Sequence, residues 1–244
     1  MLFDAHCHLQ DARFGAVLEG VLRRAAEAGV TRMVCCGTRE EDWDRVLELG
    51  RRPEIIPMAG LHPWYVDSAS PTWAARLEAA FDAGAGAGEC GLDFSDGRPP
   101  RAAQEAALRV QLDLALRRDL PVSLHCVKAA GRLLQILQET GLPAAGGLVH
   151  AFSGAPEVAL SFQALGLHLS FGRALTFPGA TRARASFEAL REDRILFETD
   201  SPDLPPCGVE GPNEPAHLAR VAAAAPRRVP AFENASRLFR RWLP

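Results

Sequence analysis

Two histidines stand one residue apart near the start of the chain, in the stretch DAHCHL at residues 4–9. The apolar residues before this stretch predict a short strand, in which successive side chains alternate between the two faces. His6 and His8 are therefore expected on one face, where two imidazoles make a natural pair of ligands for a borderline metal ion such as zinc. A single histidine is more often structural, so a metal site needs further ligands from elsewhere in the chain.

Further candidate ligands follow other apolar, strand-like stretches. They are His62, Glu89, His125, His150 and Asp200. Together with His6 and His8, five of the seven histidines of the chain fall in such positions. The carboxyl ends of the strands in a parallel barrel meet at one face, and barrel enzymes place their active sites there. Structural histidines have no reason to prefer these positions. The joint pattern therefore predicts a metal site at the carboxyl ends of the strands.

Short apolar strands alternate with longer amphipathic helices along the chain. After the opening strand, the patterns predict strands at 31–37, 54–61, 84–92, 120–125, 147–150, 167–171 and 194–198. They predict helices at 14–29, 40–49, 71–81, 100–118, 129–140, 156–165, 180–190 and 230–243. Eight strand–helix units in alternation indicate a parallel sheet. We predict a (β/α)8 TIM barrel, an α/β fold, as a single domain over residues 1–244, with a doubly wound open sheet as the alternative.

The segment 84–92 is rich in glycine, which also suggests a phosphate-binding loop. It lacks the Lys-Ser/Thr pair that a P-loop needs, and it ends on a strand-like run. We interpret it as the fourth strand, which would carry Glu89 into the site.

The composition is ordinary for a globular protein, with 48% hydrophobic and 23% charged residues. The formal net charge of −3 gives no general attraction to nucleic acid, so a phosphate would have to be held by a local site. Asp4 and His6 interrupt the N-terminus, which argues against a signal peptide or a spanning helix there. We expect a cytoplasmic monomer without a membrane partner, and the spacing of its six cysteines does not indicate disulfides.

The set of candidate ligands is larger than one ion with an open position requires. Glu89 can bridge two ions, because it enters from the strand between the other ligands. We predict two divalent ions, one held by His6, His8, Glu89 and Asp200 and the other by Glu89, His125 and His150. A single ion with spare ligands is the alternative. Mixed imidazole and carboxylate ligands accept zinc, manganese, iron or magnesium, so the sequence does not name the metal.

Two divalent cations would lower the pKa of a bound water and polarise the bond that is cleaved. Asp200 could both bind a metal ion and accept a proton from that water, so Asp200 and the bridging Glu89 are the predicted catalytic residues. His62 is expected at the rim of the site, where it would hold substrate; alternatively it is a loop histidine without a role. His168 and His217 fall at a strand start and in a helix, outside the predicted site.

Motifs throughout the chain resemble those of the TatD-type metal-dependent hydrolases, which belong to the amidohydrolase superfamily. The matching stretches are DAHCHL (4–9), GLHP (60–63), GECGLDF (88–94), PVSLHC (121–126), HAFSG (150–154), ETDSP (198–202), NEP (213–215) and ENASRLF (233–239). The resemblance implies a (β/α)8 barrel and divalent-metal hydrolysis of phosphodiester bonds in DNA, often by a nuclease that trims from the 3′ end. It also implies substrate phosphate contact by His62 and metal binding by His6, His8, Glu89, His125, His150 and Asp200.

Two departures from the family pattern lie near the substrate rather than the metal ligands. Cys126 and Val127 follow the fifth-strand histidine where a polar residue and an arginine are frequent, and Lys128 comes one place later. Phe94 stands where tyrosine is common. These changes bear on substrate preference, and we assign Lys128 to substrate binding.

Three functions are consistent with these residues. In the first, the protein hydrolyses phosphodiester bonds of DNA, either in single strands or at 3′ ends. Arg98, Lys128 and Arg173 then contact flanking phosphates. In the second, the same site hydrolyses a small amide, ester or lactone; such relatives often bridge their metals with a carboxylated lysine, whereas Glu89 favours the nuclease-like branch. In the third, the barrel binds a partner without catalysis, which the complete ligand set argues against. We predict the deoxyribonuclease.

Overall fold

A computed structural model describes residues 1–243 of the chain. Eight parallel strands run side by side in chain order. They are β1 (Leu2–Cys7), β2 (Val30–Cys36), β3 (Ile55–Ala59), β4 (Gly86–Asp93), β5 (Val122–Val127), β6 (Gly147–Val149), β7 (His168–Phe171) and β8 (Ile195–Phe197). Each predicted strand is therefore present, with its ends shifted by a few residues.

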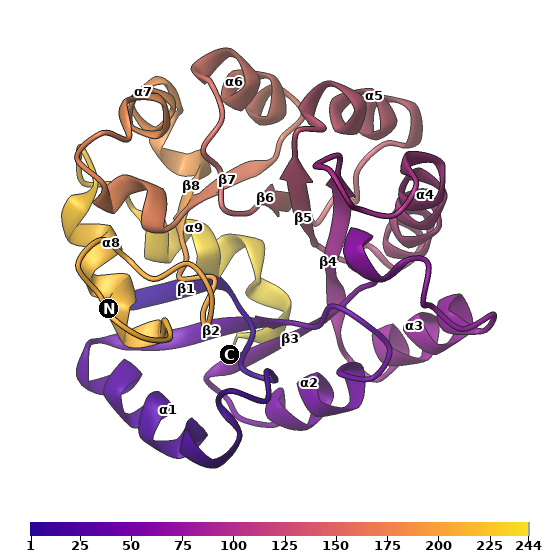
Figure 1. Cartoon of the computed structure of the whole chain (residues 1–244), viewed down its shortest axis with the longest axis horizontal. Helices are drawn as coiled ribbons and strands as arrows, with labels where there is room; N and C mark the ends of the chain where they lie inside the picture. Colours follow the sequence, from indigo (N-terminus) through magenta and orange to yellow (C-terminus); the bar gives the residue numbers. More distant parts are fainter. Residues whose placement is uncertain (244) are drawn as a thin grey trace.

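The first and last strands lie beside each other and close the sheet. Asp200, just past β8, donates its backbone N–H to the carbonyl oxygen of His6 at 3.0 Å. The buried side chain of Asp4 accepts a hydrogen bond from the backbone N–H of Thr199 at 2.9 Å. The sheet is therefore a near-closed (β/α)8 barrel, as predicted, and the open doubly wound sheet is excluded (Figure 1).

Helices follow the strands; all but the last surround the barrel (Figure 1). They are α1 (Leu18–Glu27), α2 (Trp43–Leu49), α3 (Trp73–Asp82), α4 (Arg101–Arg118), α5 (Ala130–Thr140), α6 (Pro156–Ala164), α7 (Thr181–Ala189), α8 (Leu218–Ala224) and α9 (Ala231–Leu238). The second helix begins later than predicted, and Glu40 stays outside it, where its carboxylate accepts hydrogen bonds from the backbone N–H and the hydroxyl of Ser70, both at 2.7 Å. The helix predicted at 230–243 is shorter, because a separate 3-10 turn follows it at Arg240–Trp242.

Apolar side chains on the two faces of the sheet fill two separate layers. Outward-facing residues pack under the helices in one large cluster. Inward-facing residues form a second cluster inside the barrel, made of Phe3, Ala5, Val34, Cys36, Ile56, Met58, Leu148 and Leu196. Cys7 and Cys90 lie in the outer cluster, as strand alternation predicts for the immediate neighbours of His6 and Glu89.

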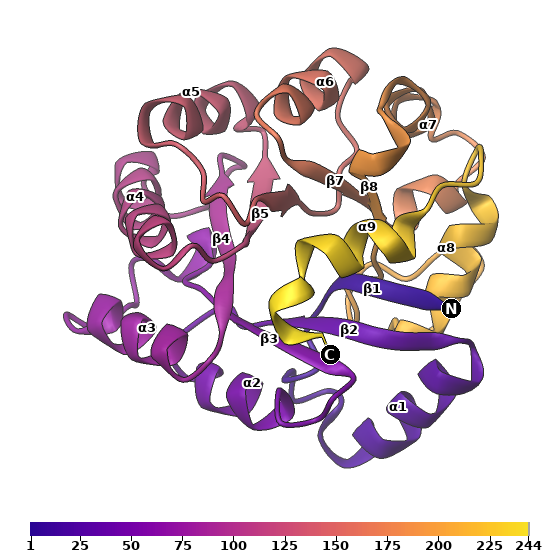
Figure 2. The same cartoon turned by 180° about the vertical axis from the view of Figure 1, so that it is seen from behind.

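Helix α9 closes the interior cluster at the amino ends of the strands, where it crosses the barrel opening (Figure 2). Ala235, Leu238 and Phe239 pack on the inward-facing residues, and the ring centre of Phe239 lies 5.8 Å from that of Phe3. Apolar side chains therefore fill this end of the barrel, and the polar side chains gather at the other. None of the helices in residues 1–243 is long and apolar enough to cross a membrane.

Candidate metal centre

The side chains predicted as ligands converge at the carboxyl ends of the strands. Three lie on strands β1, β4 and β5, namely His6, Glu89 and His125. Four follow β1, β3, β6 and β8, namely His8, His62, His150 and Asp200. All are buried except His8 and Asp200, which are partly exposed. The barrel thus brings together every strand-end histidine and carboxylate that the sequence pattern selected.

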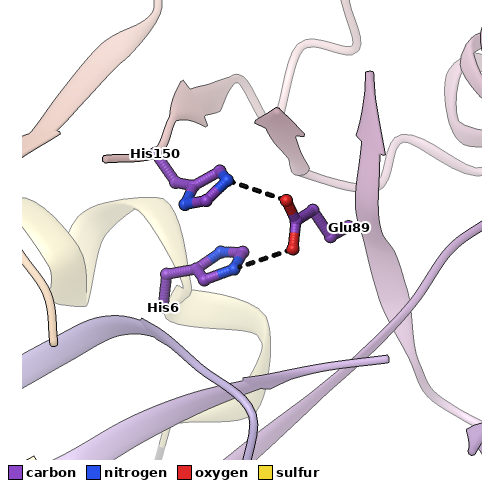
Figure 3. Close-up of side chains that lie close together, drawn as sticks. All are labelled: His6, Glu89 and His150. Carbon is purple, nitrogen blue, oxygen red and sulfur yellow. Dashed lines mark hydrogen bonds and ion pairs between the residues drawn. The ribbon is translucent and has the colours of Figure 1, made fainter. Parts of the chain in front are cut away.

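Glu89 lies at the centre of this cluster, and its two carboxylate oxygens face different histidines (Figure 3). Glu89 Oε2 lies 3.2 Å from His6 Nε2 and 3.4 Å from His8 Nε2. Asp200 completes this side, since its Oδ1 lies 3.2 Å from His8 Nε2 and 3.8 Å from His6 Nε2. These residues form one group of possible ligands around Oε2.

The other oxygen of Glu89 faces three histidines. Glu89 Oε1 lies 2.7 Å from His125 Nδ1, 2.8 Å from His150 Nε2 and 3.2 Å from His62 Nε2. The rings of His6 and His150 stack with their centres 4.0 Å apart, and each points a nitrogen at its own oxygen of Glu89 (Figure 3). A carboxylate placed between two ligand groups in this way is suited to bridge two ions.

The hydrogen bonds of His8 show whether the cluster suits a cation. Its Nδ1 lies 2.7 Å from the carbonyl oxygen of Cys36, which can only accept, so Nδ1 carries the proton. In the neutral ring, Nε2 then presents a lone pair to the nearby carboxylate oxygens of Glu89 and Asp200. Facing lone pairs repel unless a proton or a metal ion lies between them. The donor set therefore fits a divalent cation.

Ligand atoms also lie close enough to share an ion. Three overlapping groups each offer atoms within 4.8 Å of one another: His6–Glu89–His150, His6–His8–Asp200 and His62–Glu89–His125. The outer nitrogens of two rings, His125 Nε2 and His150 Nδ1, make no hydrogen bond within residues 1–243 and lie 3.5 Å and 3.6 Å from the carboxylates of Asp93 and Glu198. The mixture of imidazole and carboxylate suits several divalent metals, so the geometry does not name one.

His62 differs from the other histidines of the cluster. It is 4% exposed and lies against Glu89, so the expectation that it sits at the rim is wrong. Its Nδ1 accepts a hydrogen bond from the backbone N–H of Trp64 at 3.2 Å, which leaves the proton of the neutral ring on Nε2, facing Glu89. Burial lowers the pKa of His62 to about 4 despite the attraction of Glu89. In this tautomer His62 is a hydrogen-bond donor to the cluster.

Glu89 stays ionised although it is buried. Burial raises the pKa of Glu89. The surrounding His150, His62 and His6, together with the hydrogen bond to His125, lower it by more than burial raises it, so the pKa lies well below its usual value. The centre of the cluster therefore carries a fixed negative charge, which favours cation binding.

Two buried carboxylates with no role in the sequence analysis contact the outer nitrogens of the cluster. Asp93 Oδ2 lies 3.5 Å from His125 Nε2 and accepts a hydrogen bond from Trp64 Nε1 at 2.6 Å. Glu198 Oε1 lies 3.6 Å from His150 Nδ1 and accepts one from a backbone N–H at 2.6 Å. Partners of this kind orient metal-binding histidines. Their place in the strand-end motifs GECGLDF and ETDSP was the only signal available in the sequence.

Glycines in β4 allow Glu89 to approach β5 this closely. Gly91 has a φ of +149°, and a Cβ atom there would lie 2.1 Å from the carbonyl oxygen of His125. The glycine-rich segment at 84–92 is thus part of a strand, as predicted, and its glycines serve close backbone packing.

A cavity of about 910 Å³ lies over the cluster. Besides the candidate ligands, basic and aromatic side chains line it, among them Arg13, Arg39, Arg45, Trp64 and Tyr65. Arg13 is held by Asp11 and Asp203, each at 2.8 Å, and the guanidinium of Arg39 lies 5.1 Å from the ring centre of Tyr65. The walls therefore combine arginine side chains with aromatic surface, and carboxylates of Asp11, Glu41, Asp42 and Asp203 lie among them.

The basic residues predicted to contact substrate lie around this cavity in different ways. Lys128 follows β5 on the exposed surface and does not line the cavity. Arg173 lines a smaller neighbouring cavity of about 300 Å³. The guanidinium of Arg98 stacks on the ring of Trp64, which lines the larger cavity. His168 begins β7 at the amino end of the barrel and His217 lies in a 3-10 turn, so both are outside the cluster.

The near-closed (β/α)8 barrel with buried histidines and carboxylates at its carboxyl end is joined by matches to known proteins, which identify a metal-dependent hydrolase with the amidohydrolase superfamily fold. Residues 3–229 match the family model described as TatD related DNase, and the chain belongs to this family.

Individual relatives cover nearly the whole chain. The uncharacterized metal-dependent hydrolase YabD of Bacillus subtilis is 34% identical over 98% of this chain and 99% of its own. The 3′-5′ ssDNA/RNA exonuclease TatD of Cronobacter sakazakii is also 34% identical, over 98% of this chain and 97% of its own. The crystal structure of the TatD homologue YjjV from Escherichia coli superimposes with a TM-score of 0.90 at 36% identity, covering 98% of this chain and 95% of that one.

Proposed function

We propose that the protein is a two-metal deoxyribonuclease that shortens single-stranded DNA from its 3′ end. The observation that carries the proposal is the position of Glu89, whose two oxygens face separate groups of histidines. This arrangement suits a pair of bridged ions, and such pairs serve in-line displacement at phosphorus.

The comparisons support the reaction class more directly than the substrate. The Cronobacter relative is named an exonuclease of single-stranded DNA and RNA with 3′-5′ polarity, whereas YabD is named only as a metal-dependent hydrolase. DNA as substrate and 3′ polarity are therefore our inferences for this chain.

Divalent ions bound in the cluster would supply a nucleophilic water near neutral pH and neutralise charge on a phosphate. We assign His6, His8, Glu89 and Asp200 to one ion and Glu89, His125 and His150 to the other. The carboxylate of Asp200 is partly exposed beside His8, where it can accept a proton from the attacking water. Because it faces the cavity, Asp200 is the residue best placed for this step.

The cavity walls suit a flexible polyanion. His62 lines the cavity, and we assign its Nε2–H, which faces Glu89 in this structure, to a phosphate oxygen of the bound substrate. Trp64 is 41% exposed, and it offers with Tyr65 an aromatic surface on which unpaired bases can stack. Arg39 and Arg45 line the same cavity and can contact flanking phosphates. The net charge of the whole chain is −3, so phosphate binding depends on such local positive groups.

Digestion of labelled oligonucleotides tests this function. Single-stranded DNA carrying a 3′ or a 5′ label would be incubated with Mg²⁺, Mn²⁺ or Zn²⁺, beside a chelated sample and the double variant His125→Ala/Asp200→Asn. The matched control is His217→Asn, which changes a histidine outside the cluster. We expect metal-dependent shortening with early release of the 3′ label, lost in the double variant and retained in the control.

Protein shown to contain bound ions that cleaves no DNA with any of these metals would contradict the nuclease assignment. Early release of the 5′ label would contradict the polarity. The second function considered above, hydrolysis of a small amide, ester or lactone, would then be tested with the same variants.

A further inference from the structure

A second large cavity, of about 730 Å³, lies at the opposite end of the barrel from the metal cluster. Its walls come from residues 141–146 before β6, 165–168 at the start of β7, 193–194 before β8, and 237–240 at the end of α9. This is the face that α9 crosses (Figure 2). The function proposed above makes no use of this cavity.

Positive charge predominates in its lining. Arg194, Arg237 and Arg240 line the cavity, and within residues 1–243 none of them has a carboxylate within 4.0 Å. The one carboxylate in the lining, Asp193, pairs with Arg191 at 2.7 Å. Three guanidinium groups gathered around one cavity without a carboxylate partner leave positive charge there that an anionic ligand can neutralise.

The guanidinium groups keep donors available for such a ligand. Arg194 Nη1 donates to the carbonyl oxygen of Gly166 at 2.8 Å, and Arg237 Nη2 donates to Asn234 Oδ1. A guanidinium has several N–H groups in a planar fork, so these bonds orient each side chain and leave other donors free. That fork matches the oxygens of a phosphate group.

His168 adds a polar group that is almost completely buried. It is 7% exposed and lines the cavity, and its Nδ1–H donates to the carbonyl oxygen of Gly147 at 3.3 Å. Burial, reinforced by the positive charge of Arg194 and Arg237, lowers the pKa of His168 to about 4, so the ring is neutral at pH 7. Its Nε2 is therefore an acceptor, suited to a hydroxyl or amino group of the ligand and not to a phosphate oxygen.

Leucine side chains supply an apolar part of the wall, beside Gln138 and the backbone of residues 141–146. Leu137, Leu142, Leu165 and Leu238 line the cavity, and its volume is in the range of small-molecule sites. An inorganic anion would leave most of this space unfilled. A wholly apolar ligand would leave the guanidinium groups without a partner.

We propose that this cavity binds a mononucleotide, with its phosphate on Arg194, Arg237 and Arg240. The base lies against the leucine side chains, and His168 Nε2 accepts a hydrogen bond from a hydroxyl or amino group. Leu238 also belongs to the apolar cluster inside the barrel, so an occupied cavity stabilises the packing of α9. The proposal does not depend on the nuclease function, since the cavity lies on the other face of the barrel.

Calorimetric titration of the metal-loaded full chain with deoxyadenosine 5′-monophosphate tests the proposal. Parallel titrations use deoxyadenosine and inorganic phosphate. The test variant is Arg237→Gln/Arg240→Gln, and the control is Arg23→Gln/Arg117→Gln, which removes two exposed charges elsewhere. Hydrogen–deuterium exchange locates the bound nucleotide, because the metal cluster can also attract a phosphate.

We expect the nucleotide to protect residues 141–146 and 165–168 from exchange. Its affinity for this site should fall by at least about 10-fold in the test variant, since hydrogen bonds to charged groups are lost, and should be unchanged in the control. Deoxyadenosine and inorganic phosphate should each bind at least about 10-fold more weakly than the nucleotide. Equal affinity in wild type and test variant, protection confined to the metal cluster, equal affinity for inorganic phosphate, or no binding at millimolar nucleotide would each overturn the proposal.

Discussion

Asp93 and His125 face each other across neighbouring strands, with Asp93 Oδ2 3.5 Å from His125 Nε2. The other nitrogen of the same ring, Nδ1, lies 2.7 Å from Glu89 Oε1. Asp93 is itself fixed by a hydrogen bond from Trp64 Nε1 at 2.6 Å. The imidazole is thus held from its outer side with its inner nitrogen directed at the centre of the cluster, as expected of a partner that orients a metal ligand.

Replacing Asp93 with asparagine should weaken metal binding without unfolding the barrel. We expect a loss of about 10- to 100-fold in metal affinity. The neutral amide orients His125 less well, and it lacks the negative charge that makes the ring a more basic ligand. Competition with a chelator of known affinity would measure this. The control is Asp96→Asn, an exposed position in the loop that follows β4, and equal affinity in both variants would show that Asp93 has no such role.

Glu89→Gln should affect both groups of ligands at once. A neutral amide presents one oxygen in place of two, so it cannot serve the histidines on both sides of Glu89. We expect no more than one ion per chain by elemental analysis, and a fall in metal-dependent hydrolysis of more than about 100-fold, beyond the usual cost of losing an orienting partner. Full metal content in this variant would contradict the bridging role.

Phe239→Ala should destabilise the barrel from the end remote from the metal cluster. Phe239 is fully buried against Phe3 and Trp242, and truncation leaves a cavity beneath α9. We expect a loss of about 3–5 kcal/mol in the free energy of unfolding, measured by denaturant titration. Val17→Ala, at a position that is 53% exposed, should cost much less. A loss below about 1 kcal/mol for Phe239→Ala would argue against the closure of the barrel by this segment.

Stability should fall as the pH is lowered from about 6.5 towards 4, in part through His168. Its pKa is lowered to about 4 in the folded chain, chiefly by burial, so the unfolded chain binds the proton more readily in this interval. The stabilisation from the neutral ring is complete above pH 6.5 and is lost as the pH approaches 4, with an upper limit of about 3 kcal/mol. Unfolding titrations of wild type and His168→Asn at several pH values would check this. A difference between the two proteins that stays constant with pH would show that His168 does not contribute.

Local patterns in the sequence were sufficient to select the candidate ligands. His6, Glu89 and His125 stand at the ends of apolar runs, and the carboxyl ends of parallel strands must meet at one face of a barrel. The same alternation placed Cys7 and Cys90 outside the barrel. These inferences hold because they depend only on the two-residue period of a strand and on the order of the elements.

The position of His62 could not be read in the same way. The sequence places it after a strand and before a proline, which is equally consistent with a rim position. Its burial against Glu89 and the hydrogen bond from the backbone of Trp64 arise from the path of a loop. The supporting roles of Asp93 and Glu198 were missed for a similar reason. The sequence shows that a carboxylate lies at a strand end, but not which histidine nitrogen it contacts in the folded chain.

The sequence by itself determined the alternation of strands and helices, the family, and which histidines and carboxylates reach the carboxyl-end face of the barrel. The tertiary structure decided which atoms meet there: the division of Glu89 between two groups of histidines, the proton position on His62, and the cavity beneath α9. Element order and strand period are local properties of the chain. Distances between residues far apart in sequence depend on how the strands tilt, pair and close into a barrel, and only the folded chain fixes these.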